Sequence, residues 1–277
     1  MTKSLSYAER RASAAETFQI FVPGTEPERV ADSLGRRQGA LGSLAFDVVG
    51  AMWSRPQLSR RDRSLLVISA LAAQARDEEL VLHTQIGLRN GLTQVEIEEI
   101  LPHIAAYAGF PAAMASSRRI DKGLREGLKV EALPDRKPAT PKSDSERDRD
   151  AADVLRTLTG ARDLDPAAGL ARLETMLGEV GVVAFRFAFG DIWSRPELSR
   201  RDRSVVVISI LTALGATPEL DFHIPGGLNH GLTRVEIEEI INHLALYAGI
   251  PRAVEAARTM KAVFARLDEK KGNQATG

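Results

Sequence analysis

The feature that most constrains this chain is an internal repeat. Residues 50–111 and residues 190–251 align without a gap at a separation of 140 positions, and 37 of the 62 aligned residues are identical. A shared helical pattern alone does not produce identity at that level, so the two segments are duplicated copies. The same fold is expected twice, and each copy is expected to carry its own active site.

The repeat divides the 277 residues into two units of ordinary domain size. We expect copy 1 to span residues 10–128 and copy 2 to span residues 150–268. The segment 129–149 between them is rich in charged residues, has no apolar periodicity and contains Pro134, Pro138 and Pro141. Such a composition is typical of a linker, so we expect this stretch, up to Asp150, to be extended or poorly ordered.

Helix-start signals recur at equivalent positions of the two copies. A serine or threonine is followed three residues later by an acidic residue ahead of an apolar run, as an N-terminal cap requires. These pairs are Ser59–Asp62, Thr93–Glu96, Ser199–Asp202 and Thr233–Glu236. The run Val205–Ser209 resembles a buried strand in isolation, but its counterpart at residues 65–73 favours a helix. No alternating pattern bounded by hairpin signals occurs. We predict an all-α fold.

Composition excludes several classes of function. The formal charge is zero, with 37 basic and 37 acidic residues, so no charge footprint for nucleic acid or an anionic membrane is present. The chain contains no cysteine, which excludes disulfides, thiolate metal sites and thiol mechanisms. Its longest apolar runs fall short of the roughly 20 residues that span a bilayer, and the N-terminus lacks the apolar stretch of a secretory signal. We expect a cytoplasmic protein without nucleic-acid or membrane partners.

A glutamate and a histidine lie one helical turn apart in both copies. Advancing 100° per residue places Glu79 and His83 on one stripe of a helix, and Glu219 and His223 on its counterpart. Such a pair acts as an acid and a base when partial burial moves its pKa values toward neutrality. The alternative is an ion pair that only fixes helix packing. Because the pair recurs while its neighbours differ, we predict that both pairs face a pocket and are catalytic.

The next helix of each copy repeats a second set of polar residues at successive i,i+4 steps. Copy 1 has Glu99, His103 and Tyr107 there, and copy 2 has the set Glu239, His243 and Tyr247. The tyrosine lies nearest the apolar face and the glutamate furthest from it. We predict that the histidines and tyrosines bind substrate at the edge of the same pockets. A half-exposed histidine capped by its neighbours is the alternative.

Arginines precede and begin the helix after each Trp-Ser-Arg-Pro motif. The candidates to bind a substrate carboxylate are Arg55 and Arg63 in copy 1, with Arg195 and Arg203 in copy 2. Solvation, or pairing with Asp62 and Asp202, is the alternative for them. Trp53 and Trp193 are interpreted as core or interface residues.

Copy 2 also contains residue types that could bind a metal ion. Its candidate ligands are Glu219, His223, His230 and His243. Copy 1 has Asn90 in place of His230, and the spacing matches no standard zinc motif. We therefore predict no metal site, and we interpret His230 as a substrate-binding residue.

The ordered motifs identify a family resemblance. Each copy carries Trp-Ser-Arg-Pro, Arg-Asp-Arg-Ser, Glu-Leu-x-x-His, Gly-Leu-Thr, Glu-Ile-x-x-His and Tyr-Ala-Gly-x-Pro in this order. This run resembles the carboxymuconolactone decarboxylase family, within the superfamily of alkyl-hydroperoxidase D-like proteins. The peroxidase branch carries Cys-x-x-Cys-x-x-x-His. Here Arg76 and Glu79, and in copy 2 Ala216 and Glu219, stand at the cysteine positions, so peroxidase chemistry is absent.

The resemblance implies an alkyl-hydroperoxidase D-like helical domain in each copy, the two copies forming a pseudo-dimer about a pseudo-two-fold axis, and chains that assemble as homotrimers. It also implies loss of carbon dioxide from a carboxylated muconolactone or a related lactone acid, giving an enol-lactone. The conjugated carbonyl of such a ring accepts the electrons, so no cofactor is required. Arginine would bind the carboxylates, and His83 or His223 would return a proton to carbon.

Two further expectations complete the sequence-based picture. A non-catalytic protein that binds a small acid or only assembles is the rival to the decarboxylase. Within the decarboxylase reading, we expect the second copy to be the stronger proton donor. His230 would tune or relay for His223, and Pro225 would kink the helix and widen the space beside it.

Overall fold

All regular secondary structure is helical in the computed structural model, which describes residues 6–161 and 163–275. Copy 1 contains α1 (Tyr7–Phe21), α2 (Pro27–Gln38), α3 (Ala40–Leu44), the π-helical segment η1 (Ala45–Val49), α4 (Gly50–Trp53), α5 (Arg60–Ala73), α6 (Asp77–Arg89), α7 (Gln94–Glu98), α8 (Ile100–Tyr107) and α9 (Phe110–Leu128). Copy 2 contains α10 (Asp144–Thr159), α11 (Pro166–Leu177), α12 (Glu179–Val183), the π-helical segment η2 (Ala184–Trp193), α13 (Arg200–Leu214), α14 (Thr217–Asn229), α15 (Arg234–Leu244) and α16 (Ile250–Ala275). The all-α prediction is confirmed. Within these ranges, no helix has the length and apolar character needed to cross a membrane.

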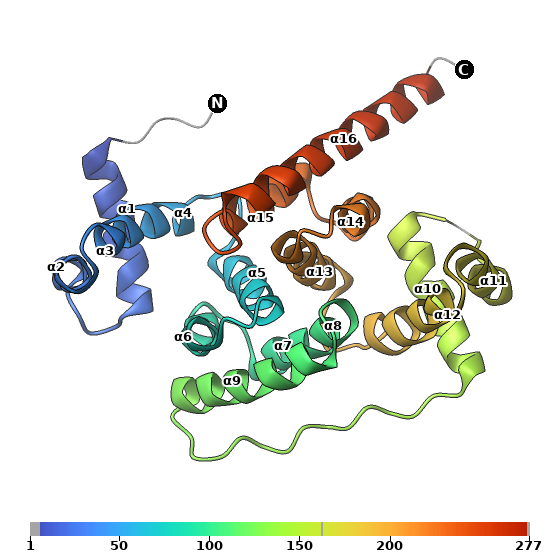
Figure 1. Ribbon diagram of the computed structural model, residues 1–277, viewed down its shortest axis with the longest axis horizontal. Helices are drawn as coiled ribbons and strands as arrows, with labels where there is room; N and C mark the ends of the chain where they lie inside the picture. The colour runs from blue at the N-terminus through green and yellow to red at the C-terminus, as the bar shows by residue number, and fades with distance from the viewer. Residues whose placement is uncertain (1–5, 162, 276–277) are drawn as a thin grey trace.

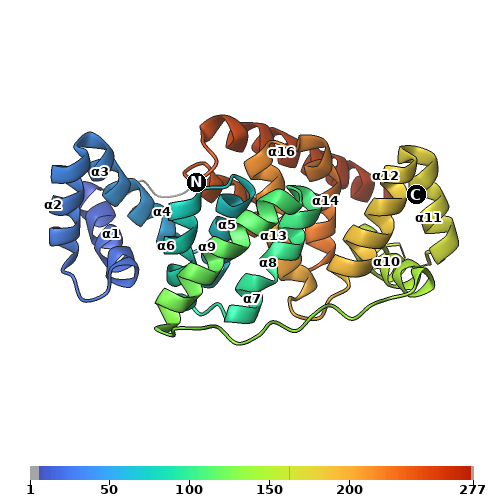
Figure 2. The same ribbon diagram turned by 60° about the horizontal axis from the view of Figure 1, so that its bottom comes forward.

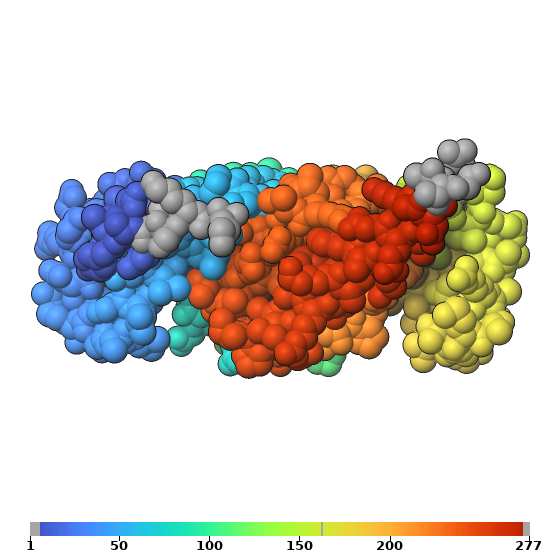
Figure 3. Space-filling model, turned by 90° about the horizontal axis from the view of Figure 1, so that it is seen from above, coloured from blue at the N-terminus to red at the C-terminus, as the bar shows by residue number. Residues whose placement is uncertain are grey.

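The equivalent helices α5 and α13 form the centre of the molecule. Both are buried on every side from their first turn onward, as helices that are apolar all round must be. They pack against each other, with α6 and α9 on one side and α14 and α16 on the opposite side (Figure 1). Helices α1–α4 and α10–α12 occupy the two ends, and seen from above α16 lies across the copy 2 half (Figure 3). This arrangement relates the copies by an approximate two-fold axis.

Reciprocal ion pairs join the first turns of the two central helices. The serine caps predicted there form, since Ser59 and Ser199 each accept a hydrogen bond from the backbone of the aspartate three residues later. Across the axis, Arg61 Nη2 lies 2.8 Å from Asp202 Oδ2. Arg201 Nη2 lies 2.9 Å from Asp62 Oδ2. Each ion pair has an equivalent in the other copy, as a two-fold rotation requires.

A close helix crossing brings each tryptophan to the centre. The continuous helical stretches that include η1 and η2 end at Trp53 and Trp193, where a Ser-Arg-Pro turn follows. Gly50 crosses α1 so closely that a Cβ atom would lie 2.3 Å from the Cα of Ala14. At the equivalent Gly190 a Cβ would lie 2.7 Å from the carbonyl oxygen of Arg147. Only glycine permits this approach, which leaves both indoles almost fully buried.

The segment between the copies is extended but shorter than predicted. Residues 130–143 have no helix and run along one face of the molecule from α9 to α10 (Figure 2). Residues from Asp144 onward, which the sequence analysis assigned to the linker, are the first turns of α10. A capping box of Ser143 and Glu146 starts that helix and overrides the charged composition. Lys142 anchors the end of the segment by donating to the carbonyl oxygen of Gly190.

Replacing Gly50 by valine should destabilise the fold, because the new side chain overlaps the backbone of α1. We expect a loss of about 2 kcal/mol or more in the free energy of unfolding, measured by urea denaturation. Gly35→Ala is the matched control, since its new Cβ would meet only Ser43 Oγ at 3.4 Å. Equal effects of the two substitutions would contradict the close crossing.

Candidate functional site

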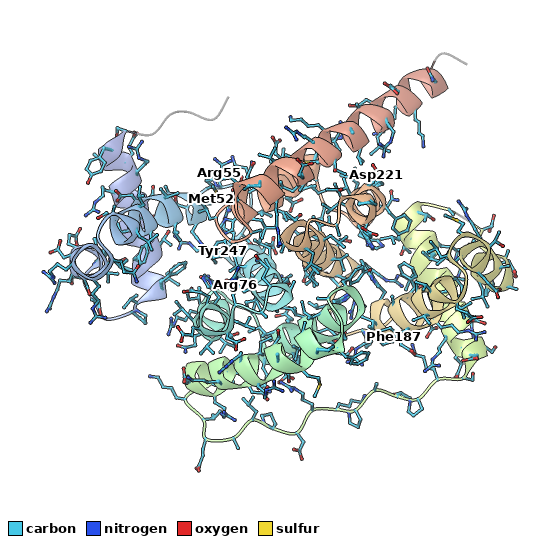
Figure 4. All side chains as sticks on the ribbon, in the orientation of Figure 1. Met52, Arg55, Arg76, Phe187, Asp221 and Tyr247 are labelled. Atoms are coloured by element: carbon cyan, nitrogen blue, oxygen red, sulfur yellow. The ribbon has the colours of Figure 1, made fainter. Side chains whose placement is uncertain are left out.

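Side chains from both copies meet in two equivalent clusters beside the central helices. Site 1 is defined by Trp53, Arg55, Arg63 and His83 of copy 1 with Glu239, His243 and Tyr247 of copy 2. Site 2 is defined by Trp193, Arg195, Arg203 and His223 of copy 2 with Glu99, His103 and Tyr107 of copy 1. Figure 4 labels Arg55 and Tyr247, which lie between the α1–α4 helices and the central helices. The expectation that each copy carries its own site is therefore wrong, because each site is shared.

A tryptophan–tyrosine hydrogen bond across the copies forms the middle of each site. Trp53 Nε1 donates to Tyr247 Oη at 2.8 Å, and Trp193 Nε1 donates to Tyr107 Oη at 2.9 Å. Since an indole nitrogen only donates, the phenol oxygen accepts and its own proton remains available to another group. Burial raises the pKa of both tyrosines above the usual value, so the phenols stay protonated.

The predicted catalytic histidines are buried in these aromatic clusters. His83 stacks on Trp53 with ring centroids 6.0 Å apart and meets Tyr247 edge-on at 5.2 Å. His223 stacks on Trp193 at 5.8 Å and meets Tyr107 edge-on at 5.5 Å. Each imidazole is only 5% exposed, and its Nδ1 has no hydrogen-bond partner among the described residues. Each ring thus keeps one nitrogen without a partner inside an aromatic cluster.

Burial makes both imidazoles weakly basic. It lowers the pKa of His83 and of His223 to about 3, because the charged form loses its hydration. The rings are therefore neutral near pH 7. The two differ in one hydrogen bond, since Tyr107 Oη lies 3.2 Å from His223 Nε2 and is hydrogen-bonded to it. Site 1 has no equivalent hydrogen bond between Tyr247 and His83 within the described part of the chain.

Glu99 and Glu239 are members of the two clusters that the sequence did not lead us to include. The helical pattern placed them furthest from the core of their own copy, yet they are only 4% and 1% exposed. The other copy covers them. Arg55 holds Glu239 with Nε 2.8 Å from Oε1 and Nη2 2.7 Å from Oε2, and Arg63 Nη1 lies 2.9 Å from Oε1.

Site 2 repeats this arrangement around Glu99. Arg195 Nε lies 2.8 Å from Glu99 Oε1, and Arg203 Nη1 lies 3.0 Å from the same oxygen. The sequence signal that could have indicated these residues is that a glutamate occupies this position in both copies.

The predicted arginines divide into two kinds. Arg63 and Arg203 have fully buried side chains and hold the glutamate and a histidine in place. Arg55 and Arg195 are 30% and 23% exposed and lie at the edge of the site. Their hydrogen bonds and ion pairs use Nε and Nη2, which leaves Nη1 to a ligand. The first pair thus lies inside the site, and the second pair lies at its edge.

His243 and His103 have a defined protonation state. Arg63 Nη1 donates to His243 Nδ1 at 2.8 Å, and Arg203 Nη1 donates to His103 Nε2 at 2.9 Å. An arginine only donates, so the facing nitrogen accepts and the other nitrogen carries the proton. Burial, and then the arginine charges, lower the pKa of both histidines far below the usual value. Each presents one N–H that has no partner among the described residues.

The predicted glutamate–histidine pairs do not form. Glu79 and Glu219 lie in the first turns of α6 and α14 and are exposed. The imidazole Nδ1 atoms remain without partners, because the rings turn away toward the tryptophan and tyrosine. Glu79 contributes to site 1 only through its charge, which together with the larger effect of burial raises the pKa of Tyr247.

His230 has other partners than His223. Its Nδ1 lies 2.9 Å from Ser204 Oγ and its Nε2 lies 3.0 Å from Thr157 Oγ1. In copy 1, Asn90 Nδ2 donates to Ser64 Oγ at 2.9 Å, so the two residues are structural counterparts. With both ring nitrogens engaged, His230 forms no relay to His223 in this arrangement. Helix α14 also runs through Pro225 without a break. It has 13 residues, the same length as α6.

The comparisons with known proteins place the chain in a family. The model of the carboxymuconolactone decarboxylase family matches residues 41–122 and 179–262, which together are more than half of the chain. The chain therefore belongs to the carboxymuconolactone decarboxylase family, and the two matches confirm the tandem duplication.

Three relatives show how far this likeness extends. The 4-carboxymuconolactone decarboxylase of Acinetobacter baylyi is 45% identical over 82 residues, 30% of this chain and 61% of that protein. The nitrosuccinic acid decarboxylase of Metarhizium robertsii is 39% identical over 70 residues, 25% of this chain and 49% of that protein. An uncharacterised 15.0 kDa protein of Paracoccus denitrificans is 26% identical over 114 residues, 39% of this chain and 85% of that protein. The matched parts thus span about three fifths and one half of the first two relatives.

Acidification should destabilise the protein through the buried histidines. Between about pH 6.5 and about pH 3 the unfolded chain binds a proton at His83 and the folded chain does not. The free energy of unfolding therefore falls as the pH falls through this window, by up to about 1.4 kcal/mol per pH unit for each such histidine. The free energy of unfolding, measured by urea denaturation at several values between about pH 7 and about pH 5, should depend less steeply on pH in His83→Gln than in the wild type. The dependence should be weakest in His83→Gln/His223→Gln. An unchanged slope would contradict the neutral buried imidazole.

Proposed function

We propose that this chain is a cofactor-independent decarboxylase that acts on a carboxylated muconolactone, such as 4-carboxymuconolactone, or a closely related lactone acid. The observation that supports it best is a neutral, buried imidazole beside a tyrosine and a half-exposed arginine in a site shared by the two copies. Family membership supports the same reading, and so do the names of the first two relatives, which are decarboxylases of two different small acids.

Binding begins at the edge of the site. A substrate carboxylate accepts a hydrogen bond from Nη1 of Arg55 or Arg195. The buried glutamate holds Nε and Nη2 of Arg55, and it holds Nε of Arg195. The glutamate thereby fixes the guanidinium plane before substrate arrives, which reduces the entropy lost on binding. The ring of the substrate then lies against the tryptophan, tyrosine and histidine.

Decarboxylation moves an electron pair into the lactone. The bond from ring carbon to carboxylate breaks, carbon dioxide leaves, and the pair spreads through the conjugated carbonyl to give a dienolate. The hydroxyl proton of Tyr247 in site 1, and the N–H of His243 or His103, are the donors available to the developing oxygen charge. Donors fixed in a buried site stabilise such charge strongly because they need not reorganise.

The imidazole completes the reaction by returning a proton to carbon. Burial alone keeps His83 and His223 neutral. An anionic substrate beside the ring raises its pKa, because the bound carboxylate replaces the lost hydration of the imidazolium. The ring therefore takes up a proton together with the substrate and donates it to the dienolate carbon. It regains a proton with the next substrate.

Removing both imidazoles should abolish turnover. We expect His83→Ala/His223→Ala to lower kcat by about 10²-fold to 10⁴-fold, the usual contribution of a positioned acid–base group. The assay follows ultraviolet absorbance and carbon dioxide release with 4-carboxymuconolactone, and with nitrosuccinate as a second small acid. His230→Asn, which installs the residue that copy 1 already uses, is the folded control. Saturable binding without carbon dioxide release from wild-type protein would favour the non-catalytic acid-binding alternative.

We also propose that the two-domain chains assemble as a homotrimer. Large apolar side chains are exposed at equivalent places of both copies, as a contact surface used by each copy requires. These are Leu41, Leu44, Phe110 and Met114 in copy 1 and Val180, Val183, Ile250 and Val254 in copy 2.

Light scattering after size-exclusion chromatography tests the trimer. We expect a mass of about 90 kDa, three times the 30.1 kDa of one chain. Leu41→Glu/Val180→Glu should shift the mass toward the single chain by placing charge in the contact. Leu128→Glu is the control, since Leu128 is an exposed apolar residue whose counterpart in copy 2 is Asp268. A wild-type mass of one chain would contradict the assembly.

A further inference from the structure

The two sites differ in charge at one repeated position. Residue 197 of copy 2 is Glu197, and its Oε2 lies 3.4 Å from Arg195 Nη2. The equivalent residue of copy 1 is the neutral Gln57. In site 1, Arg55 and Arg63 therefore share the single carboxylate of Glu239, so the arginines outnumber the carboxylates paired with them by one. The charge of the exposed Glu79 acts on Tyr247 and makes no ion pair with either arginine. In site 2 the equivalent arginines, Arg195 and Arg203, face two carboxylates, those of Glu99 and Glu197. The numbers of paired positive and negative groups are therefore equal.

A neighbouring arginine strengthens this difference. Arg200 in copy 2 pairs with Asp153, with Nη2 2.8 Å from Oδ2. Its counterpart Arg60 makes no side-chain hydrogen bond within the described residues, and its Nη1 is buried without a partner. The positive charge of Arg60 is close enough to act on the guanidinium of Arg63. The exposed Glu238 is the other carboxylate that acts on Arg55, and it does so only at a distance.

The two histidines are equally buried, but they differ in their hydrogen bonding to the tyrosine. Tyr107 ends α8 in a helical conformation, and its hydroxyl shares a hydrogen bond with His223 Nε2, which occupies that nitrogen. Tyr247 instead lies in a turn after α15, and Gln74 Nε2 donates to its carbonyl oxygen at 3.1 Å. Leu214, the counterpart of Gln74, has no side-chain donor. The two tyrosines thus meet their histidines differently. His83 contacts the ring of Tyr247 but makes no hydrogen bond to it within the described residues.

We infer that the two sites are not equivalent, and that site 1 alone binds an anionic lactone substrate tightly. Gln57 and Glu197 are the residues that determine this, because the carboxylate of Glu197 supplies to site 2 the negative charge that a substrate would otherwise bring, whereas Gln57 supplies none to site 1. The inference rests on the proposed function for the class of ligand. It reverses the order of the copies expected from the sequence, which was based on His230 and Pro225.

Binding of a stable ligand tests this without turnover. Isocitric lactone, a γ-lactone with two carboxylates, is titrated into the full chain by isothermal calorimetry. We expect one binding event per chain. Gln57→Glu should weaken it at least about tenfold, the order expected for a unit charge a few Å away at a half-buried position. Glu197→Gln should create a second event, raising the stoichiometry toward two per chain.

The two tryptophans locate the binding, since each site contains one of the only two in the chain. In Trp193→Phe protein the remaining Trp53 reports on an intact site 1, and its fluorescence should titrate with the affinity seen by calorimetry. In Trp53→Phe protein the reporter Trp193 lies in an intact site 2 and should show no saturation in that range. Circular dichroism confirms that each variant is folded.

Two results would overturn the inference. One is two equal binding events per chain in the wild type, with Gln57→Glu and Glu197→Gln having no effect. The other is no saturable binding by the wild type, whether or not decarboxylation is observed. Binding at site 1 without any decarboxylation would leave the inference standing and reject only the proposed reaction.

Discussion

The structure depends on two buried glutamates, one from each copy, and each is enclosed by residues of the other copy. Glu99 and Glu239 lose nearly all contact with water, and two arginines from the opposite copy compensate each of them. Removing one partner of such a buried pair typically costs about 3–5 kcal/mol, because it leaves a charge uncompensated. Neither copy can satisfy its own arginines, so the central helices α5 and α13 are held together by more than apolar contact. The tryptophan–tyrosine hydrogen bonds follow the same exchange, and the sites exist only where the copies meet.

This exchange explains what a tandem chain can do that two identical subunits cannot. In a symmetric dimer every substitution appears in both sites. Here the two members of the pair are encoded separately, so position 57 carries glutamine while position 197 carries glutamate. The glutamate, arginine, tryptophan and tyrosine that hold the interface together are the same in both copies. The residues around them that set the charge and the hydrogen bonding of the histidine are the ones that differ.

Local signals allowed the fold to be predicted, but not the exchange between copies. The caps at Ser59 and Thr93 depend only on neighbouring residues, and they form as expected. Glu99 was misplaced because a helical pattern describes one helix against its own core, whereas Arg195 and Arg203 reach it from about 100 residues away. One clue was available in the sequence. Buried arginines require carboxylate partners, and a glutamate occupies the position of Glu99 and Glu239 in both copies.

The fate of the predicted pair of Glu79 and His83 shows what the site requires chemically. A glutamate bonded to the imidazole would hold it protonated before substrate arrived, and would repel an anionic ligand. With the glutamate in solvent, burial leaves His83 neutral, and the surplus positive charge lies on arginine at the edge of the site. In the proposed mechanism the substrate then brings the negative charge that both groups lack. Substrate binding and proton uptake would form one event there, which a catalyst needs when its acid is to be strong only in the complex.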